Sequence, residues 1–183
     1  MVYCAGLKKP VPIYTLRLIY NSLILSHLNY GQLIWGSNNS RLTKLQKKSV
    51  RIICNTKYNA HTDPLFNHLQ ILKLKDIFRL HCLKFYHKFL NSKLPTYFDD
   101  FLTRRANRYN TRNTNFMLPQ TRTTGARHRA RYLIPLNVNC TDSNIKDRVA
   151  SYSIHGLTNY FKNTCVASYQ LFCNIANCYI CNN

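Results

Sequence analysis

The chain has 183 residues, of which 26 are Lys or Arg and six are acidic, so its formal net charge at pH 7 is +20. The length excludes a complete polymerase with several subdomains, and the charge favours a polyanionic partner, nucleic acid before an anionic membrane surface. Because the sequence has neither a run of about 18 apolar residues nor a compact secretion signal, we expect an intracellular protein, nuclear or cytoplasmic, with no membrane partner.

Patterns typical of helices occupy most of residues 1–102. Between residues 13 and 27, apolar side chains recur at helical spacing on so many sides that we expect this helix to be largely buried. An amphipathic helix follows at 40–52, and residues 62–74 predict a short helix and a turn. The strongest pattern lies at 76–91, where two apolar rows cover a wide arc, as is typical of the central helix of a bundle.

The predicted helix at 40–52 has an apolar stripe and a basic one. Ser40 suits the N-cap position, and Leu42, Leu45 and Ile52 are expected to pack inward. Five cations share the neighbouring stripe, namely Arg41, Lys44, Lys47, Lys48 and Arg51. No acidic residue stands four positions from any of them, so these charges repel one another unless phosphates or counterions neutralise them. The alternative interpretation is a solvated charged face with no specific role.

The composition changes after residue 102. From 103 to 141 the chain has no acidic residue and few large apolar ones, which indicates an extended, partly disordered basic arm. The arginines of this arm are Arg104, Arg105, Arg108, Arg112, Arg122, Arg127, Arg129 and Arg131. Residues 142–183 predict a weakly helical, Cys-rich tail. The fold class is therefore mainly α: a small helical bundle over 1–102 with a basic, partly disordered C-terminal extension.

The motif Tyr97-Phe98-Asp99-Asp100 has the form of the Tyr-x-Asp-Asp motif with which reverse transcriptases hold two magnesium ions. That motif requires a hairpin between two strands, but here it follows a predicted helix end at Leu94-Pro95. A third carboxylate would have to come from Asp63 or Asp76, both at predicted helix starts. We therefore expect no enzymatic activity. The alternative, an enzyme in its own right, depends on the two aspartates of the motif.

Cysteines near the C-terminus offer a candidate metal site. Four thiolates can hold zinc tetrahedrally, and the candidates are Cys165, Cys173, Cys178 and Cys181. The last two form a C-x2-C pair, but the spacing of the first two is loose and no Gly supplies the turn between ligands. We expect free thiols and no cofactor, with zinc as the alternative.

Several segments together resemble the region just beyond the polymerase palm in jockey-like non-LTR retrotransposon reverse transcriptases. They include residues 20–31 (YNSLILSHLNYG), Ile34-Trp35-Gly36, Leu45-Gln46-Lys47-Lys48 with Arg51-Ile52-Ile53, residues 61–66 (HTDPLF), residues 69–74 with Asp76-Ile77, and Leu94-Pro95. Beyond residue 103 the similarity is looser, at Tyr109-Asn110-Thr111-Arg112, Arg122-Thr123 and Pro135 with Asn137.

The resemblance implies a thumb and a C-terminal extension, which lie against the template–primer duplex and do not hold the catalytic metals. It predicts a non-catalytic, nucleic-acid-binding fragment of a retrotransposon RNA-directed DNA polymerase, with the missing palm as a further partner. The expected contacts to phosphates of RNA or an RNA–DNA duplex are Arg41, Lys44, Lys47, Lys48, Arg51, Arg104, Arg105, Arg108 and Arg112. The alternative is a decayed transposon remnant, a pseudogene product with no activity, whose Trp35, Phe78 and Phe85 would be exposed without the palm.

Overall fold

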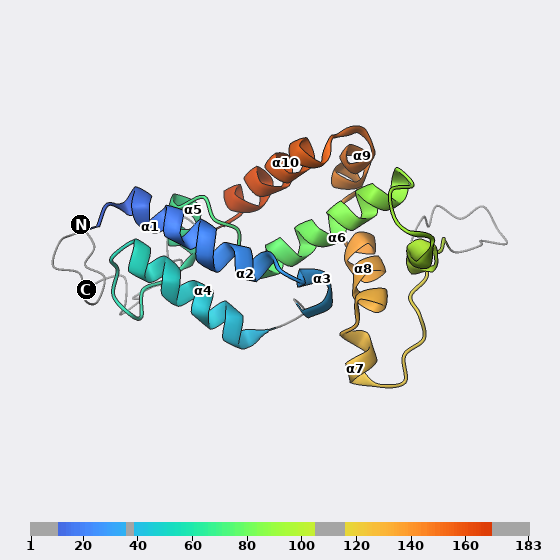
Figure 1. The fold of residues 1–183 in the computed structure, drawn as a ribbon, viewed down its shortest axis with the longest axis horizontal. Coiled ribbons are helices and arrows are strands. Elements are labelled where there is room, and N and C mark those ends of the chain that lie inside the picture. Colours follow the sequence, from blue (N-terminus) through green and yellow to red (C-terminus); the bar gives the residue numbers. More distant parts are fainter. Residues whose placement is uncertain (1–10, 36–38, 105–115, 170–183) are drawn as a thin grey trace. The chain divides into compact units, whose positions relative to one another are not determined.

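The computed structural model describes residues 11–35, 39–104 and 116–169, and these residues form helices joined by turns and loops (Figure 1). The only β-type pairing between described residues is an isolated antiparallel bridge between Arg104 and Phe116. The mainly α fold predicted from the sequence is confirmed. The chain divides into two compact units: the first holds residues 11–31, 39–77 and 162–169 of the described part, and the second holds residues 32–35, 78–104 and 116–161.

The first unit begins with a continuous helical stretch of three parts: α1 (Ile13–Ile19), the π-helix η1 (Tyr20–Leu25) and α2 (Ser26–Asn29). It ends at Gly31, whose φ of 61° lies in the left-handed region that glycine adopts without strain. The prediction that this helix is largely buried is wrong. One side packs inward, through Leu16, Tyr20 and Leu28, and contacts α4. Its exposed apolar side chains are Ile13, Tyr14, Leu18, Ile19 and Leu23.

Helix α4 (Ser40–Ile53) lies where the sequence predicts it, but its start and its inward face differ from the prediction. Asn39 is the N-cap, because its side-chain oxygen accepts from the Leu42 N–H at 3.2 Å, and Ser40 already lies inside the helix. The buried residues are Gln46, Val50 and Ile53. Leu45 and Ile52, which were expected to pack inward, are 58% and 46% exposed.

Two further helices complete the first unit and lead into the second. Helix α5 (Asp63–His68) is the short helix predicted within residues 62–74, and Pro64 lies in its first turn, where the missing N–H is tolerated. Helix α6 (Leu74–Leu90) spans the boundary, since residues up to Ile77 belong to the first unit and residues from Phe78 to the second. Both apolar rows predicted for α6 are buried along most of its length, as expected for a central helix.

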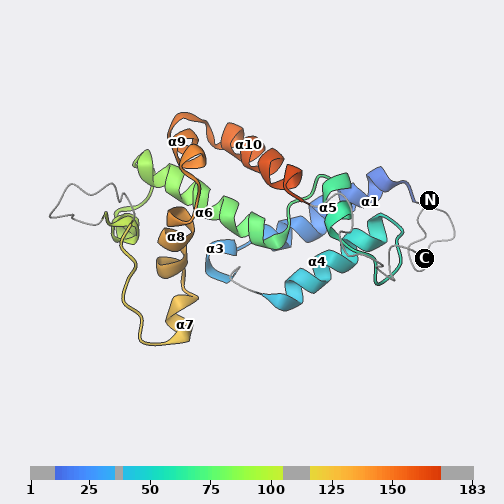
Figure 2. The same ribbon diagram turned by 180° about the vertical axis from the view of Figure 1, so that it is seen from behind.

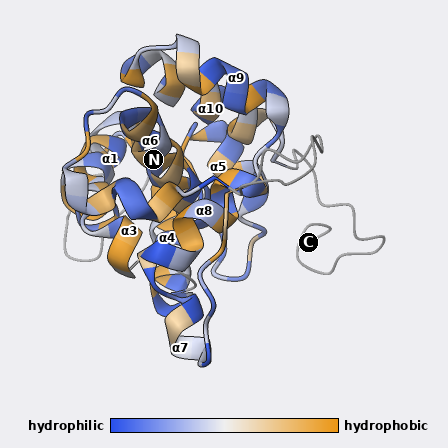
Figure 3. Cartoon of the chain, turned by 90° about the vertical axis from the view of Figure 1, so that its right-hand side faces the viewer, coloured by the Kyte–Doolittle hydropathy of each residue, from blue (hydrophilic) through white to orange (hydrophobic). Residues whose placement is uncertain are grey.

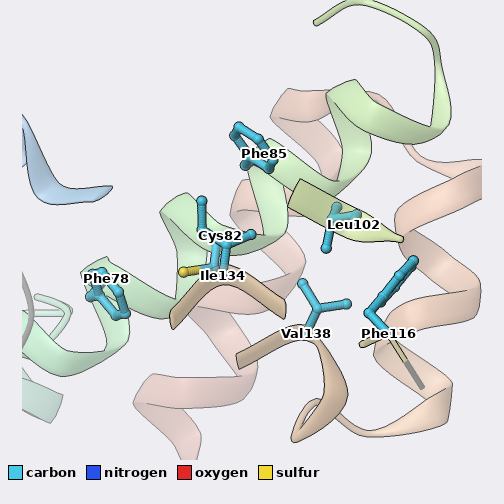
Figure 4. Close-up of a cluster of buried hydrophobic side chains, with 7 residues drawn as sticks. All are labelled: Phe78, Cys82, Phe85, Leu102, Phe116, Ile134 and Val138. Atoms are coloured by element: carbon cyan, nitrogen blue, oxygen red, sulfur yellow. The ribbon is translucent and has the colours of Figure 1, made fainter. Parts of the chain in front are cut away.

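The second unit is built around one apolar cluster (Figure 4). Its helices are α3 (Gln32–Trp35), most of α6, the 3-10 helix η2 (Thr96–Leu102), α7 (Thr124–Arg127), α8 (Ala130–Asn139), α9 (Ser143–Ser151) and most of α10 (Ile154–Ala167). The cluster consists of Phe78, Cys82, Phe85, Leu102, Phe116, Ile134 and Val138. Helices α9 and α10 follow α8 and meet at a short corner (Figure 2).

The Arg-rich segment differs from the extended arm that its composition predicts. Residues 105–115 lie outside the described residues, but Phe116 is buried and α8 contributes Ile134 and Val138 to the apolar cluster. Phe116 is held by Asn139, which accepts from its N–H and donates to its carbonyl, each at 2.9 Å. Part of the segment therefore belongs to the core of the second unit, and residue 103 does not begin a separate region.

Candidate nucleic-acid interface

The cations Arg41, Lys44, Lys47, Lys48 and Arg51 gather on one side of α4, which we call the α4 basic face. Because Gln46, Val50 and Ile53 fix the inward side of the helix, the 3-4-3 spacing of 41, 44, 48 and 51 places these side chains away from it. Arg41, Lys44 and Lys48 are exposed, whereas Lys47 and Arg51 are half-buried. In Figure 3, α4 carries both hydrophilic (blue) and hydrophobic (orange) residues. The stripe predicted from the sequence is thus assembled on the helix surface.

None of the five cations of the α4 basic face forms an ion pair with a carboxylate in the part of the chain that the structure describes. An ion pair elsewhere in the first unit joins Lys73 Nζ, on the turn before α6, to Asp63 Oδ2, on α5, at 2.7 Å. Cations three or four residues apart on a helix repel one another and destabilise it by about 0.2–0.5 kcal/mol per pair. A bound polyanion would remove that repulsion, so the α4 basic face is electrostatically suited to phosphate.

Arg51 differs from the other four cations, since its Nε donates to the Ala60 carbonyl oxygen at 2.9 Å. The bond fixes the guanidinium against the turn that follows α4 and leaves its four terminal N–H groups for other acceptors. Arg51 therefore also has a structural role, and its replacement would disturb the residues 54–60 as well as remove a charge.

The exposed Leu45 and Ile52 flank the cations on α4. A helical turn brings residues three or four apart side by side, so Leu45 neighbours Arg41 and Lys48, and Ile52 neighbours Lys48. The sequence does not reveal this mixed face, because apolarity alone predicts that Leu45 and Ile52 pack inward. A partner on this face would meet aliphatic side chains as well as positive charge.

The four arginines of the predicted basic arm that were expected to contact phosphates are not placed together by the structure. Arg104 is exposed at the isolated bridge to Phe116, and Arg105, Arg108 and Arg112 lie outside the described residues. Burial raises the pKa of Tyr86, while the positive charge of Arg104 lowers it. Arg104 therefore lies close enough to Tyr86 in the second unit to affect its ionisation.

The motif Tyr97-Phe98-Asp99-Asp100 lies in the 3-10 helix η2 and not in a hairpin between strands. Its two aspartates are exposed, and the described residues provide no third carboxylate near them. Its aromatic rings instead pack in the second unit: the Phe98 and Phe85 centroids lie 5.6 Å apart at 82°, and Phe98 and Phe101 lie 5.2 Å apart. The motif thus supplies aromatic contacts at the edge of the apolar cluster.

Of the zinc candidates, Cys165 is half-buried on α10, while Cys173, Cys178 and Cys181 lie outside the described residues. Within residues 11–35, 39–104 and 116–169, no three His, Cys, Asp or Glu side chains gather closely enough to hold a metal ion. Of the helices in these same ranges, none is both long and apolar enough to cross a membrane.

Comparison with known proteins finds no match: no family model fits the chain, and no curated protein or solved structure shows significant similarity to it.

An exposed arginine that the sequence analysis did not single out for function is Arg148 on α9. Its guanidinium lies over the ring of Tyr160, on α10, and it donates to the hydroxyl of Tyr152. The i, i+4 spacing of Arg148 and Tyr152 is visible in the sequence, but the pairing with Tyr160 requires the corner between the two helices.

Proposed function

We propose that this chain binds nucleic acid through the α4 basic face, without sequence preference, and that it performs no chemistry itself. One observation carries the proposal: five cations lie on 11 consecutive residues of one helix, on its outward side, and none has an acidic partner among the described residues. Solvated faces of globular proteins usually mix both signs of charge. A face of one sign on a chain of net charge +20 is suited to a polyanion.

The dimensions of the α4 basic face suit a duplex. From Arg41 to Arg51 the helix axis extends roughly 15 Å, at about 1.5 Å per residue. Double-stranded nucleic acid carries about one negative charge per 1.7 Å of its axis, so a duplex lying along α4 presents roughly nine phosphates over that length. Counted over both strands, the duplex therefore offers more phosphates over this length than α4 has cations, and contacts to phosphates give affinity without reading the sequence.

The parent protein in this proposal is a retrotransposon RNA-directed DNA polymerase, of which the chain is the thumb-like C-terminal part. The resemblance supports this, and the helical fold with a basic helix is compatible with it. The ligand would then be RNA or an RNA–DNA duplex. The exposed apolar residues of α1 and η1, including Leu18 and Leu23, are the surface we assign to contact with the palm.

Burial in the second unit disfavours the alternative of a remnant that cannot cover its own apolar residues. Phe78 and Phe85, which would be exposed in that case, are each 7% exposed and belong to the apolar cluster. The side chain of Trp35 lies outside the described part of the chain. Residues of the chain itself bury the cluster, which supports a chain that folds without an added palm.

The test is binding to a labelled RNA hairpin and to an RNA–DNA duplex between 50 and 200 mM salt, with a variant that carries Arg41→Gln, Lys44→Gln and Lys48→Gln. Gln has a helix propensity close to that of Lys and Arg, so α4 should persist. Arg51 is left unchanged because of its bond to Ala60. We expect the log–log salt slope to become shallower by about 0.9 for each phosphate that the variant no longer binds, which is about 2–3 for the three substitutions.

The matched control carries Lys75→Gln, Lys88→Gln and Lys93→Gln, three exposed cations outside α4, so its net charge falls by the same three units. An equal loss of binding in both variants would contradict a specific role for the α4 basic face. Binding that does not depend on salt would contradict contact with phosphates altogether. Magnesium-dependent polymerase or nuclease activity that Asp99→Ala abolishes would contradict the absence of chemistry.

A further inference from the structure

The corner between α9 and α10 holds an ordered group of one arginine and two tyrosines. Arg148 Nη1 donates to Tyr152 Oη at 3.0 Å. The Arg148 guanidinium carbon lies 4.4 Å from the Tyr160 ring centroid and 5.9 Å from that of Tyr152. The two rings stand edge to face, with centroids 6.0 Å apart and planes at 79°. We call these three residues the Arg–Tyr group.

Buried contacts hold the backbone beneath the Arg–Tyr group. The carbonyl of Tyr152 accepts from Nε2 of His87, a residue on α6 that is 6% exposed, at 2.9 Å. The N–H of Tyr152 donates to the Arg148 carbonyl at 3.0 Å and closes the last turn of α9. The Tyr152 ring therefore extends from a fixed backbone, and the guanidinium that bonds to its hydroxyl is fixed in turn.

The corner does not need the Arg–Tyr group for its cohesion. Val149 on α9 and Leu157 on α10 are fully buried, and Ser153 Oγ caps α10 by accepting from the Gly156 N–H at 3.1 Å. A cation–π contact at an exposed site adds little to stability. The apolar residues beneath therefore dominate the stability of the corner, so the contacts of Arg148 with the two tyrosines are open to a role in binding.

The Arg148 side chain keeps most of its binding capacity. It is exposed, and no carboxylate of the described residues pairs with it. Its guanidinium carbon lies 4.4 Å from the Tyr160 ring centroid, and because the side chain is exposed, part of the guanidinium remains accessible to solvent. The bond to Tyr152 uses one of five N–H donors. A flat, cationic, ordered surface with free donors is suited to stack an aromatic, electron-rich ring that carries a nearby negative charge.

We infer that the Arg–Tyr group is a binding site for an unpaired nucleobase of single-stranded RNA or DNA. The base stacks on the solvent-accessible part of the Arg148 guanidinium, and the remaining N–H groups of Arg148 contact the adjacent phosphate. In a duplex the faces of the bases are covered by their neighbours, so this site selects a single strand or a strand end. The inference rests on the proposed nucleic-acid binding but concerns a different unit, an arginine in contact with two tyrosines, and a different strand state.

The test compares two short single strands of equal length and charge: one contains 2-aminopurine among natural bases, and the other has the same backbone with abasic positions. Arg148→Lys keeps the charge but removes the planar group. We expect it to weaken binding of the base-containing strand about tenfold, to reduce the quenching of 2-aminopurine, and to leave the abasic strand unaffected. Tyr160→Leu, which removes the ring behind the guanidinium, should weaken the same strand.

The matched control is Arg122→Lys, an exposed arginine of the same unit with no aromatic contact among the described residues. Circular dichroism of each variant establishes that the helices persist. If Arg148→Lys binds both strands like the unchanged protein, or if the abasic strand binds as tightly as the other, the base-stacking site is refuted. If a duplex still binds in a way that depends on the α4 basic face, the proposed function survives that result. If no nucleic acid binds even at low salt, both fail.

Discussion

At the scale of single residues, Gln46 shows why polarity is a poor guide to the inward face of α4. It is 1% exposed, and its side chain satisfies three polar groups of the first unit. Nε2 donates to Tyr20 Oη at 3.0 Å and to the Leu72 carbonyl at 2.9 Å, while Oε1 accepts from the Leu74 N–H at 2.9 Å. The glutamine thus joins η1, α4 and the start of α6.

Replacement of Gln46 should be among the more damaging changes in the first unit. In Gln46→Leu the volume is nearly kept, but the carbonyl of Leu72 and the N–H of Leu74 lose their partner. A buried polar group without a partner costs about 1–3 kcal/mol, so we expect a loss on the order of 3 kcal/mol in the free energy of unfolding from urea denaturation. Tyr20→Phe, which removes one hydroxyl of the same network, should lower the free energy of unfolding by less, about 1 kcal/mol. If Gln46→Leu leaves the free energy of unfolding unchanged, the hydrogen bonds of Gln46 contribute nothing to stability.

The candidate site could be predicted from the sequence only in part, and the residues show why. The 3-4-3 spacing of the cations is a local property of a helix, so Arg41, Lys44 and Lys48 could be placed on one face from the sequence alone. Which face turns inward is decided by distant residues, here Tyr20, Leu72 and Leu74, and so Leu45 and Ile52 were placed wrongly. The bond from Arg51 to Ala60 depends on a turn whose path the sequence does not specify.

At the scale of elements, the end of α10 is tied to α5 and α6 within the first unit by Tyr169. Its hydroxyl donates to Asp76 Oδ2 at 2.6 Å and accepts from the Lys73 N–H at 3.0 Å. Lys73 Nζ lies 4.2 Å from the centre of the same ring, and Phe66 meets that ring edge to face, with centroids 6.4 Å apart. Another bond in this region joins Asn67 Nδ2 to the Val166 carbonyl at 2.8 Å.

The Tyr169 contacts predict a dependence of stability on alkaline pH. Burial, and then the bond to Asp76, raise the pKa of Tyr169 above its ordinary value of 10.0. The folded state therefore holds this proton more tightly than the unfolded state, so the stabilisation is complete below about pH 10 and is lost as the pH rises beyond it. Tyr169→Phe should lower the free energy of unfolding at pH 7 by about 1.5–3 kcal/mol, the usual contribution of a hydrogen bond to a charged group.

The same variant should lose less stability between pH 9 and 11 than the unchanged chain, as measured by urea denaturation at each pH. Some loss of stability at alkaline pH will remain in Tyr169→Phe, because burial also raises the pKa of Tyr20 and of Tyr86. Tyr58, which is 87% exposed, supplies the control: Tyr58→Phe should leave both the stability and its pH dependence unchanged. If the free energy of unfolding of Tyr169→Phe falls with pH as steeply as that of the unchanged chain, the Tyr169 hydroxyl is not the group that titrates.

The helices were predictable to different degrees, for local reasons. Helix α6 was placed correctly because 17 residues with wide apolar rows leave no other interpretation. Helix α8 was missed because Pro135, which lies inside it, lacks the N–H of a helix interior and normally argues against one. The weakly helical pattern expected within residues 142–183 is divided between α9 and α10, and the corner at Tyr152 and Ser153 that separates them is where the Arg–Tyr group forms.

At the scale of the whole molecule, the two compact units are assembled from separate stretches of the chain. Residues 162–169 join the first unit although the stretch 78–161 of the second precedes them, and residues 32–35 belong to the second although they interrupt the first. Boundaries at 102 and 141, drawn where the composition changes, do not coincide with this division. Composition changes along the chain, but compactness depends on contacts between distant segments, which the sequence alone does not reveal.

A net charge of +20 should make the stability of the whole molecule depend on salt. Self-repulsion of a strongly charged chain opposes the compact state, and salt at 0.1 M screens charges that lie more than about 10 Å apart. We expect the melting temperature, followed by circular dichroism at 222 nm, to rise between 20 and 300 mM NaCl. If screening raises the free energy of unfolding by about 1 kcal/mol, the melting temperature should rise by about 2–4 °C for a chain of this size.

Surface ion pairs act in the opposite direction, because salt weakens them. Lys73 with Asp63 is such a pair, but the chain has only six acidic residues against 26 Lys and Arg, so repulsion should dominate the response to salt. The variant that neutralises Arg41, Lys44 and Lys48 removes repulsion concentrated on one helix, whereas the control that neutralises Lys75, Lys88 and Lys93 removes the same charge from separate places. The α4 variant should therefore be more stable than the control at 20 mM NaCl, with the difference shrinking at 300 mM. A melting temperature that falls with salt in all three proteins would mean that attraction between charges, and not their repulsion, governs this chain.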